Sequence, residues 1–153
     1  MRLLTYRDYA GVHVGALRDD STIVPLDEVA PSMLALIEGG EAALEQARAI
    51  VASDAEGVPL NGVILLAPIP QPRQDIICLG MNYVEHAYES MRAKGLEPSL
   101  PPHPVFSTKA ATTVCANGDT IPLDPNVTKE LDYEVELAFV IGKLGKNIAK
   151  NDA

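Results

Sequence analysis

The chain has 153 residues and a net charge of −9, with 47% hydrophobic and 22% charged residues, a composition typical of a globular protein. A surface this acidic repels phosphate backbones and anionic lipids, so we expect neither nucleic acid nor a membrane as a partner. No apolar run approaches the ~20 residues that span a bilayer, the start does not resemble a signal peptide, and Cys78 and Cys115 form no metal-type pair, so we expect a cytoplasmic protein with two reduced, buried thiols.

Residues 1–66 predict a small α+β module. Alternating apolar and polar residues, separated by turn residues, predict three short strands. Two stretches of good helix formers follow, with Ser32 as the expected N-cap of the first and the pair Gly39–Gly40 as the break between them. The predicted strands cover residues 1–6, 12–17 and 22–25, and the predicted helices cover residues 32–37 and 41–52.

A proline-rich segment marks the predicted domain boundary. The letters LLAPIPQPR place three prolines within residues 68–72. Proline fixes φ and removes an amide donor, so this segment is expected to be extended and semi-rigid. We therefore assign residues 1–66 to the N-terminal module and residues 67–153 to a second domain. Its predicted elements are a strand at 75–79, a helix at 83–94 capped by Asn82 and Gly95, a short strand at 105–107 and the strongest strand pattern of the chain at 131–141.

Two glutamates stand on the last of these predicted strands. Alternate side chains of a strand share a face, so Glu134 and Glu136 would point the same way, with Cα atoms about 6.5–7 Å apart. Two carboxylates so placed repel each other unless a cation lies between them, and Mg²⁺, Mn²⁺ and Ca²⁺ prefer oxygen ligands. The alternative is a solvated strand face with both charges in water, and spacing alone leaves that alternative open.

A histidine and a glutamate form the second candidate pair, in the letters NYVEHAYE. On a helix His86 and Glu89 share a face, so the carboxylate can fix the imidazole tautomer and leave the other ring nitrogen to take a proton from water. The alternative is an ordinary ion pair on a helix surface. Of the other histidines, we interpret His13 as an exposed strand residue and His103 as part of a rigid proline loop.

From residue 67 onward, several sequence segments occur in an order that identifies a family more specifically than either candidate pair does. The segments APIPQPRQDIICLGMNYVEHAYE, PVFSTKAATTV, GDTIPL and ELDYEVELAFVIGK follow one another. This series resembles the fumarylacetoacetate hydrolase family, which carries a proline-rich lead-in, an H-A-x-E helix start, a Phe-x-Lys strand and a D-Y-E-x-E-L strand in the same order. The resemblance implies that the second domain is the start of a mixed β-roll, preceded by the family's variable N-terminal module.

The resemblance also assigns roles to the two pairs. Glu134 and Glu136 match the two metal-binding glutamates of the family's E-x-E motif. His86 and Glu89 match its water-activating pair. The implied cofactor is a divalent cation, with Mg²⁺ first and Mn²⁺ or Ca²⁺ as alternatives.

Two further residues are implied to contact substrate. Tyr83 occupies the tyrosine of a Gly-x-Asn-Tyr motif that ends the preceding strand in the family. Lys109 matches the Phe-x-Lys lysine, although here two residues instead of one separate it from the phenylalanine. The family is typically homodimeric, so a homodimer is expected.

The implied chemistry is a metal-dependent hydrolase that cleaves a C–C bond in 2,4-diketo acids, such as acylpyruvates, through a metal-bound enolate. Isomerases, tautomerases and decarboxylases of the same superfamily, acting on 2-hydroxy-diene-dioates or oxaloacetate, reuse that intermediate and form the alternative.

The resemblance further implies a third metal ligand, an aspartate well downstream of the E-x-E strand, and residues 142–153 contain no match to it. The expected arrangement is therefore the first part of a catalytic domain, completed by the remainder of the same protein or by another chain. A second class of function stays open, a catalytically incomplete fragment that acts as a binding or structural piece.

Overall fold

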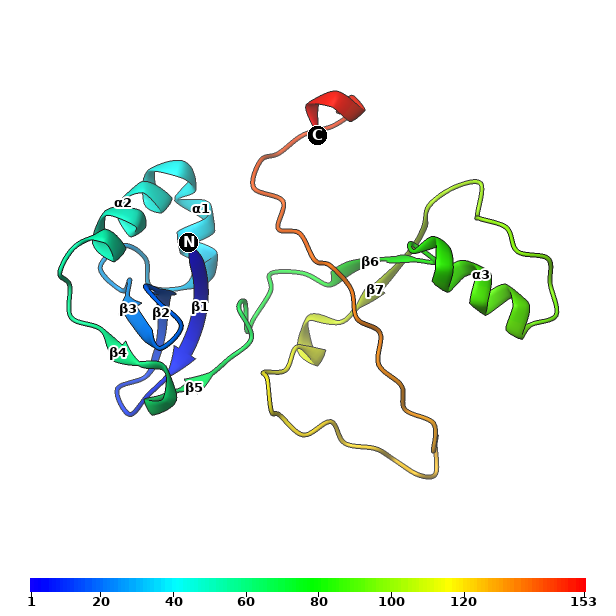
Figure 1. Cartoon of the computed structure of the whole chain (residues 1–153), viewed down its shortest axis with the longest axis horizontal. Coiled ribbons are helices and arrows are strands. Elements are labelled where there is room, and N and C mark those ends of the chain that lie inside the picture. Colours follow the sequence, from blue (N-terminus) through cyan, green and yellow to red (C-terminus); the bar gives the residue numbers. More distant parts are fainter. The chain divides into compact units, whose positions relative to one another are not determined.

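A computed structural model describes all 153 residues, and the chain divides into two compact units. One unit contains residues 1–69 and 116–153, and the other contains residues 70–115 (Figure 1). Helices and antiparallel strands occur together, which confirms the predicted α+β class. The β-roll and the domain boundary after residue 66 stay predictions. No helix has the length and the apolar character that a membrane span requires.

A five-stranded antiparallel sheet forms the frame of the first unit, in the order β4-β3-β2-β1-β5. β1 and β2 pair along their whole length because the two strands are joined by a tight turn. In this turn, the Asp8 side chain accepts hydrogen bonds from the backbone N–H groups of Ala10 and Gly11. The strands are β1 (Arg2–Arg7), β2 (Val12–Leu17), β3 (Thr22–Pro25), β4 (Val58–Pro59) and β5 (Ile64–Leu65).

Two helices, α1 (Met33–Glu38) and α2 (Gly40–Ala52), follow the third strand. The Ser32 hydroxyl accepts a hydrogen bond from the backbone N–H of Ala35 at 3.1 Å, which confirms the predicted N-cap. The break between the helices is Gly39 alone, because Gly40, whose φ of 60° suits glycine, already begins α2 one residue earlier than predicted. Arg18 donates to the backbone carbonyl of Val51 in the last turn of α2 and to those of Ser53 and Ala55 just after it, and so ties the end of that helix to the sheet.

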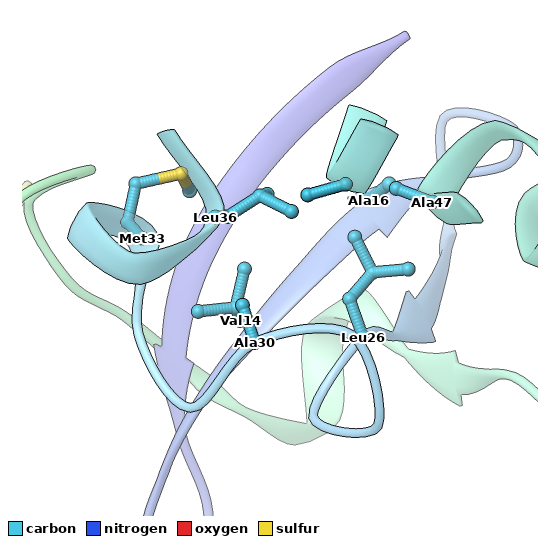
Figure 2. Close-up of a cluster of buried hydrophobic side chains, with 8 residues drawn as sticks. Val14, Ala16, Leu26, Ala30, Met33, Leu36 and Ala47 are labelled. Atoms are coloured by element: carbon cyan, nitrogen blue, oxygen red, sulfur yellow. The ribbon is translucent and has the colours of Figure 1, made fainter. Parts of the chain in front are cut away.

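The core of the first unit lies between the sheet and the two helices (Figure 2). Strand β2 contributes Val14 and Ala16, and helix α1 contributes Met33 and Leu36. Leu36 is completely buried, and its side chain points into this cluster. Burial of such side chains on one helix face is what holds these short helices, since helices of this length are marginal by themselves. The remaining members of the cluster are Leu26, Ala30, Ala43 and Ala47.

A Leu36→Ala substitution is expected to lower the free energy of unfolding by about 2–5 kcal/mol, because it removes buried methyl groups and leaves a cavity. Chemical denaturation of the chain measures this loss. The matched control is Leu144→Ala, since Leu144 is 99% exposed. The same substitution there should leave the denaturant concentration at the midpoint of unfolding unchanged. Equal midpoints for the two variants would contradict the packing shown in Figure 2.

The second unit consists of a two-stranded antiparallel ribbon and one helix. Strands β6 (Ile76–Gly80) and β7 (Val105–Lys109) pair along their length, so β7 continues two residues beyond the predicted strand. Helix α3 (Val84–Ala93) lies between them in sequence. The Asp75 carboxylate accepts from the backbone N–H of Ala111, which joins the start of β6 to the chain just after β7 at one end of the ribbon.

The strand predicted at residues 131–141 is not formed, and this prediction is wrong for the structure. The whole segment has no regular secondary structure and is exposed. Its alternating pattern encodes a strand, but a strand also needs a neighbour that satisfies its backbone N–H and C=O groups. No other strand pairs with this segment. Glu134 and Glu136 therefore lie on exposed, irregular chain.

The two cysteines are free, as predicted, but only one of them is partly covered. Cys78 is half-buried in β6, whereas Cys115 is exposed. The prediction of two buried thiols is wrong for Cys115 because it lies in a loop that packs against no core.

Candidate active site

Helix α3 positions the predicted general base. Its sequence contains good helix formers, and Gly95, with a φ of 69°, follows its C-terminus. The helix begins one residue later than predicted, so Tyr83 is the N-cap residue in place of Asn82, and no side chain caps the first turn. Tyr83 therefore stands at the start of the helix, with 42% of its surface exposed.

His86 and Glu89 are both exposed on α3. Helix geometry places residues three apart on one face, and the buried residue of this helix is Ala87. No hydrogen bond or ion pair joins His86 to Glu89, so the contact that would fix the imidazole tautomer is not made in this structure. Catalytic hydrogen bonds are commonly long in ligand-free proteins and shorten when substrate binds.

Lys109 is the last residue of β7, where it pairs with Ile76 across the ribbon. Its side chain is exposed. Together with Tyr83, His86 and Glu89 it belongs to the unit that covers residues 70–115. This unit therefore presents an imidazole, a carboxylate, a phenol and an ammonium group from one ribbon and one helix.

Glu134 and Glu136 belong to the other unit, in its segment of residues 116–153. The donors they offer are carboxylate oxygens, which Mg²⁺, Mn²⁺ and Ca²⁺ all accept, so the chemistry of this donor pair fits a hard divalent cation. No group of three or more His, Cys, Asp or Glu side chains is gathered where it could hold a metal ion. The two glutamates thus fit part of a ligand set.

An open depression on the first unit contains none of the predicted site residues. Its lining residues are Asp20, Ser21, Thr22, Gly57, Pro59, Leu60 and Asn61.

One cluster of titratable groups lies outside the predicted site. The interpretation of His13 as an exposed strand residue is wrong, because its side chain is only 22% exposed and lies between the carboxylates of Asp8 and Asp27. The ring is covered on one side by Tyr6, its partner across the β1–β2 pair. Alternation along one strand does not reveal such contacts, and the two aspartates, both in turns, were the only available signal.

The environment of this cluster shifts two pKa values. Hydrogen bonds from the backbone N–H groups of Ala10 and Gly11, together with His13, hold the pKa of Asp8 below its usual value. Burial raises the pKa of the Tyr6 phenol, and the nearby carboxylates of Asp27 and Asp8 raise it further.

Comparison with known proteins identifies two kinds of similarity. The family model described as the fumarylacetoacetate (FAA) hydrolase C-terminal domain matches residues 75–153, just over half of the chain. All six residues predicted for the active site lie within the matched region.

Relatives align with the whole chain. Oxaloacetate tautomerase YisK of Bacillus subtilis (strain 168) is 36% identical over 171 residues, which cover 100% of this chain and 56% of the relative. Mitochondrial oxaloacetate tautomerase fahd2 of Xenopus laevis is 37% identical, and mitochondrial oxaloacetate tautomerase FAHD2A of Homo sapiens is 34% identical. In both cases 160 aligned residues cover 100% of this chain and 48% of the relative. The chain thus spans about half the length of these relatives.

Proposed function

Because this chain belongs to the fumarylacetoacetate hydrolase family, we propose that it contributes to an enzyme that interconverts the keto and enol forms of oxaloacetate. The observation that carries the proposal is the alignment of oxaloacetate tautomerases over the chain's whole length. The tautomerase alternative expected from the sequence is therefore favoured over C–C bond hydrolysis.

Glu134 and Glu136 would hold a divalent cation, with further ligands supplied by the remaining half of the relatives' length. When bound, this cation supplies positive charge that draws electron density from the keto carbonyl. The chain carries a net charge of −9, so a dianionic substrate needs such a positive centre in order to bind. Mg²⁺ stays the first candidate because both donors are carboxylate oxygens.

The four residues of the other unit supply the groups that a keto–enol conversion requires. His86 would take a proton from carbon 3, and the electron pair left behind would form the carbon–carbon double bond. A proton returned to the carbonyl oxygen completes the enol, so the substrate gains and loses one proton and nothing is oxidised. Glu89 would orient the imidazole on α3 and stabilise its protonated form.

Lys109 and Tyr83 would position the substrate. The ammonium of Lys109, at the exposed end of β7, offers a charge partner for a substrate carboxylate. Tyr83 offers a phenol at the start of α3, where the positive end of the helix dipole also favours a negative charge.

The function predicted first from the sequence, hydrolysis of 2,4-diketo acids, stays a prediction, and so does decarboxylation. The homodimer, the cytoplasmic location and Mg²⁺ as the native cation also stay predictions.

The test is a comparison of substrates with the protein at the full length of its relatives. The rate of conversion of enol to keto oxaloacetate, followed by ultraviolet absorbance with Mg²⁺ or Mn²⁺ present, should exceed the rate in buffer with the same cation. Pyruvate release from oxaloacetate faster than in buffer with the same cation would indicate a decarboxylase, and cleavage of an acylpyruvate would indicate the hydrolase. Turnover of none of these, together with no cation binding, would favour the binding-fragment interpretation.

A further inference from the structure

His13 joins two turns that lie far apart in the sequence. Its Nε2 atom lies 3.2 Å from Oδ1 of Asp8, and its Nδ1 atom lies 3.1 Å from Oδ2 of Asp27. Asp8 belongs to the turn between β1 and β2, whereas Asp27 follows β3 in the connection to α1. The imidazole ring in β2 therefore bridges the β1–β2 turn and the segment that follows β3.

Each aspartate is fixed by its own surroundings. Oδ1 of Asp8 also accepts from the backbone N–H groups of Ala10 and Gly11, at 2.7 and 3.1 Å, so it cannot turn away without opening that turn. Asp27 follows Leu26, which is completely buried and whose N–H donates to the carbonyl of Val14 at 2.8 Å. The two carboxylates thus present fixed acceptors to the ring.

This geometry constrains the protonation state of the ring. An ionised carboxylate only accepts hydrogen bonds, while a neutral imidazole has one N–H donor and one lone pair. A neutral ring would therefore satisfy one aspartate and direct its lone pair at the other. Only the imidazolium form has the two N–H groups that both contacts require, and its charge also offsets two negative ones.

We propose that protonated His13 is a clamp that holds the β1–β2 turn to the connection between β3 and α1, and that loss of its proton loosens the N-terminal module. The other titratable group that faces the ring is the Tyr6 phenol, whose ring centroid lies 5.3 Å from that of His13. Phenols titrate near 10, and the pKa of Tyr6 is raised further, so Tyr6 stays neutral wherever histidine titrates.

The sign of the effect follows from the form that the folded state prefers. Stabilisation by the clamp is complete where the imidazole carries its proton, and it is lost as the pH rises and the folded protein gives that proton up. Asp8 acts in the opposite direction, because its lowered pKa gives stability that is lost only as the pH falls below the ordinary carboxyl range. Above the ordinary carboxyl range the contribution of Asp8 is therefore constant, so a comparison at two higher pH values leaves it out.

The experiment is thermal unfolding of the chain, followed through the NMR signals of Val14 and Ala16, for the wild type and a His13→Gln variant. Glutamine can donate to only one aspartate at a time and does not titrate. At about pH 5.5 the wild type is expected to unfold roughly 3–6 °C above the variant, and at about pH 8.5 this difference should disappear. The matched control is His103→Gln, which removes an exposed histidine and should follow the wild type at both pH values.

A second measurement keeps the proposal testable if the variant does not fold. In ¹⁵N-edited spectra of the wild type at the lower pH, both ring N–H hydrogens of His13 should exchange with water more slowly than those of His103, because each faces a carboxylate oxygen. The proposal is overturned by a pH-independent difference between the wild type and His13→Gln, or by ring N–H hydrogens of His13 that exchange as fast as those of His103.

Discussion

A His86→Gln variant is expected to tautomerise oxaloacetate roughly 10²- to 10⁴-fold more slowly than the wild type, the usual contribution of a general base. Glutamine keeps a hydrogen-bonding side chain of similar length on α3 but cannot take up a proton at neutral pH. The rate is measured with the protein at the relatives' full length, with the cation saturating. Since His86 is not assigned to the metal, the affinity for Mn²⁺ should not change.

The matched control for this substitution is His103→Gln, which makes the same chemical change in an exposed loop. It should leave the tautomerisation rate unaltered. Equal rates for His86→Gln and the wild type would remove His86 from the proposed mechanism. An equal loss in both variants would show that the effect comes from folding and not from proton transfer.

A Glu134→Gln variant is expected to bind a divalent cation at least roughly 10- to 100-fold more weakly, since even outer-shell partners of metal ligands have effects of that size. Glutamine retains one neutral oxygen but removes the negative charge that favours a hard cation. Titration calorimetry with Mn²⁺ measures the affinity. The variant should also tautomerise oxaloacetate more slowly at a fixed cation concentration. Part of this rate should return at higher cation concentration, because His86 on α3 is still present.

Glu130→Gln is the control for this change, since Glu130 is an exposed glutamate in the same segment but lies outside the E-x-E pair. It should bind Mn²⁺ as the wild type does, whereas Glu136→Gln should behave like Glu134→Gln. Unchanged Mn²⁺ affinity in both E-x-E variants would show that the cation site lies elsewhere.

The elements predicted most accurately from the sequence are those whose formation depends on residues close by in the chain. The strands at residues 12–17 and 22–25 have the predicted bounds, because alternation and turn residues act over a few positions. The Ser32 cap formed as expected for the same reason, since its partner lies three residues away. The helix that carries His86 and Glu89 was displaced by only one residue at its start.

Features that depend on distant partners could not be predicted in the same way. Residues 131–141 have a strand pattern, but a strand forms only beside another strand, and none pairs with this segment. His13 was misinterpreted because its two aspartates come from separate turns, 5 and 14 residues away. The roles of the six predicted site residues rest on the family motifs, since neither local pattern nor the present geometry tests them.

The most direct test of the proposed tautomerase is the exchange of the carbon-3 protons of oxaloacetate in deuterated water, followed by proton NMR. In the presence of the protein and its cation, exchange should be much faster than in buffer with the cation alone. It should slow in His86→Gln, and pyruvate should accumulate no faster than in that buffer. Exchange no faster than in buffer would contradict proton transfer at carbon 3, and with it the function proposed for this chain.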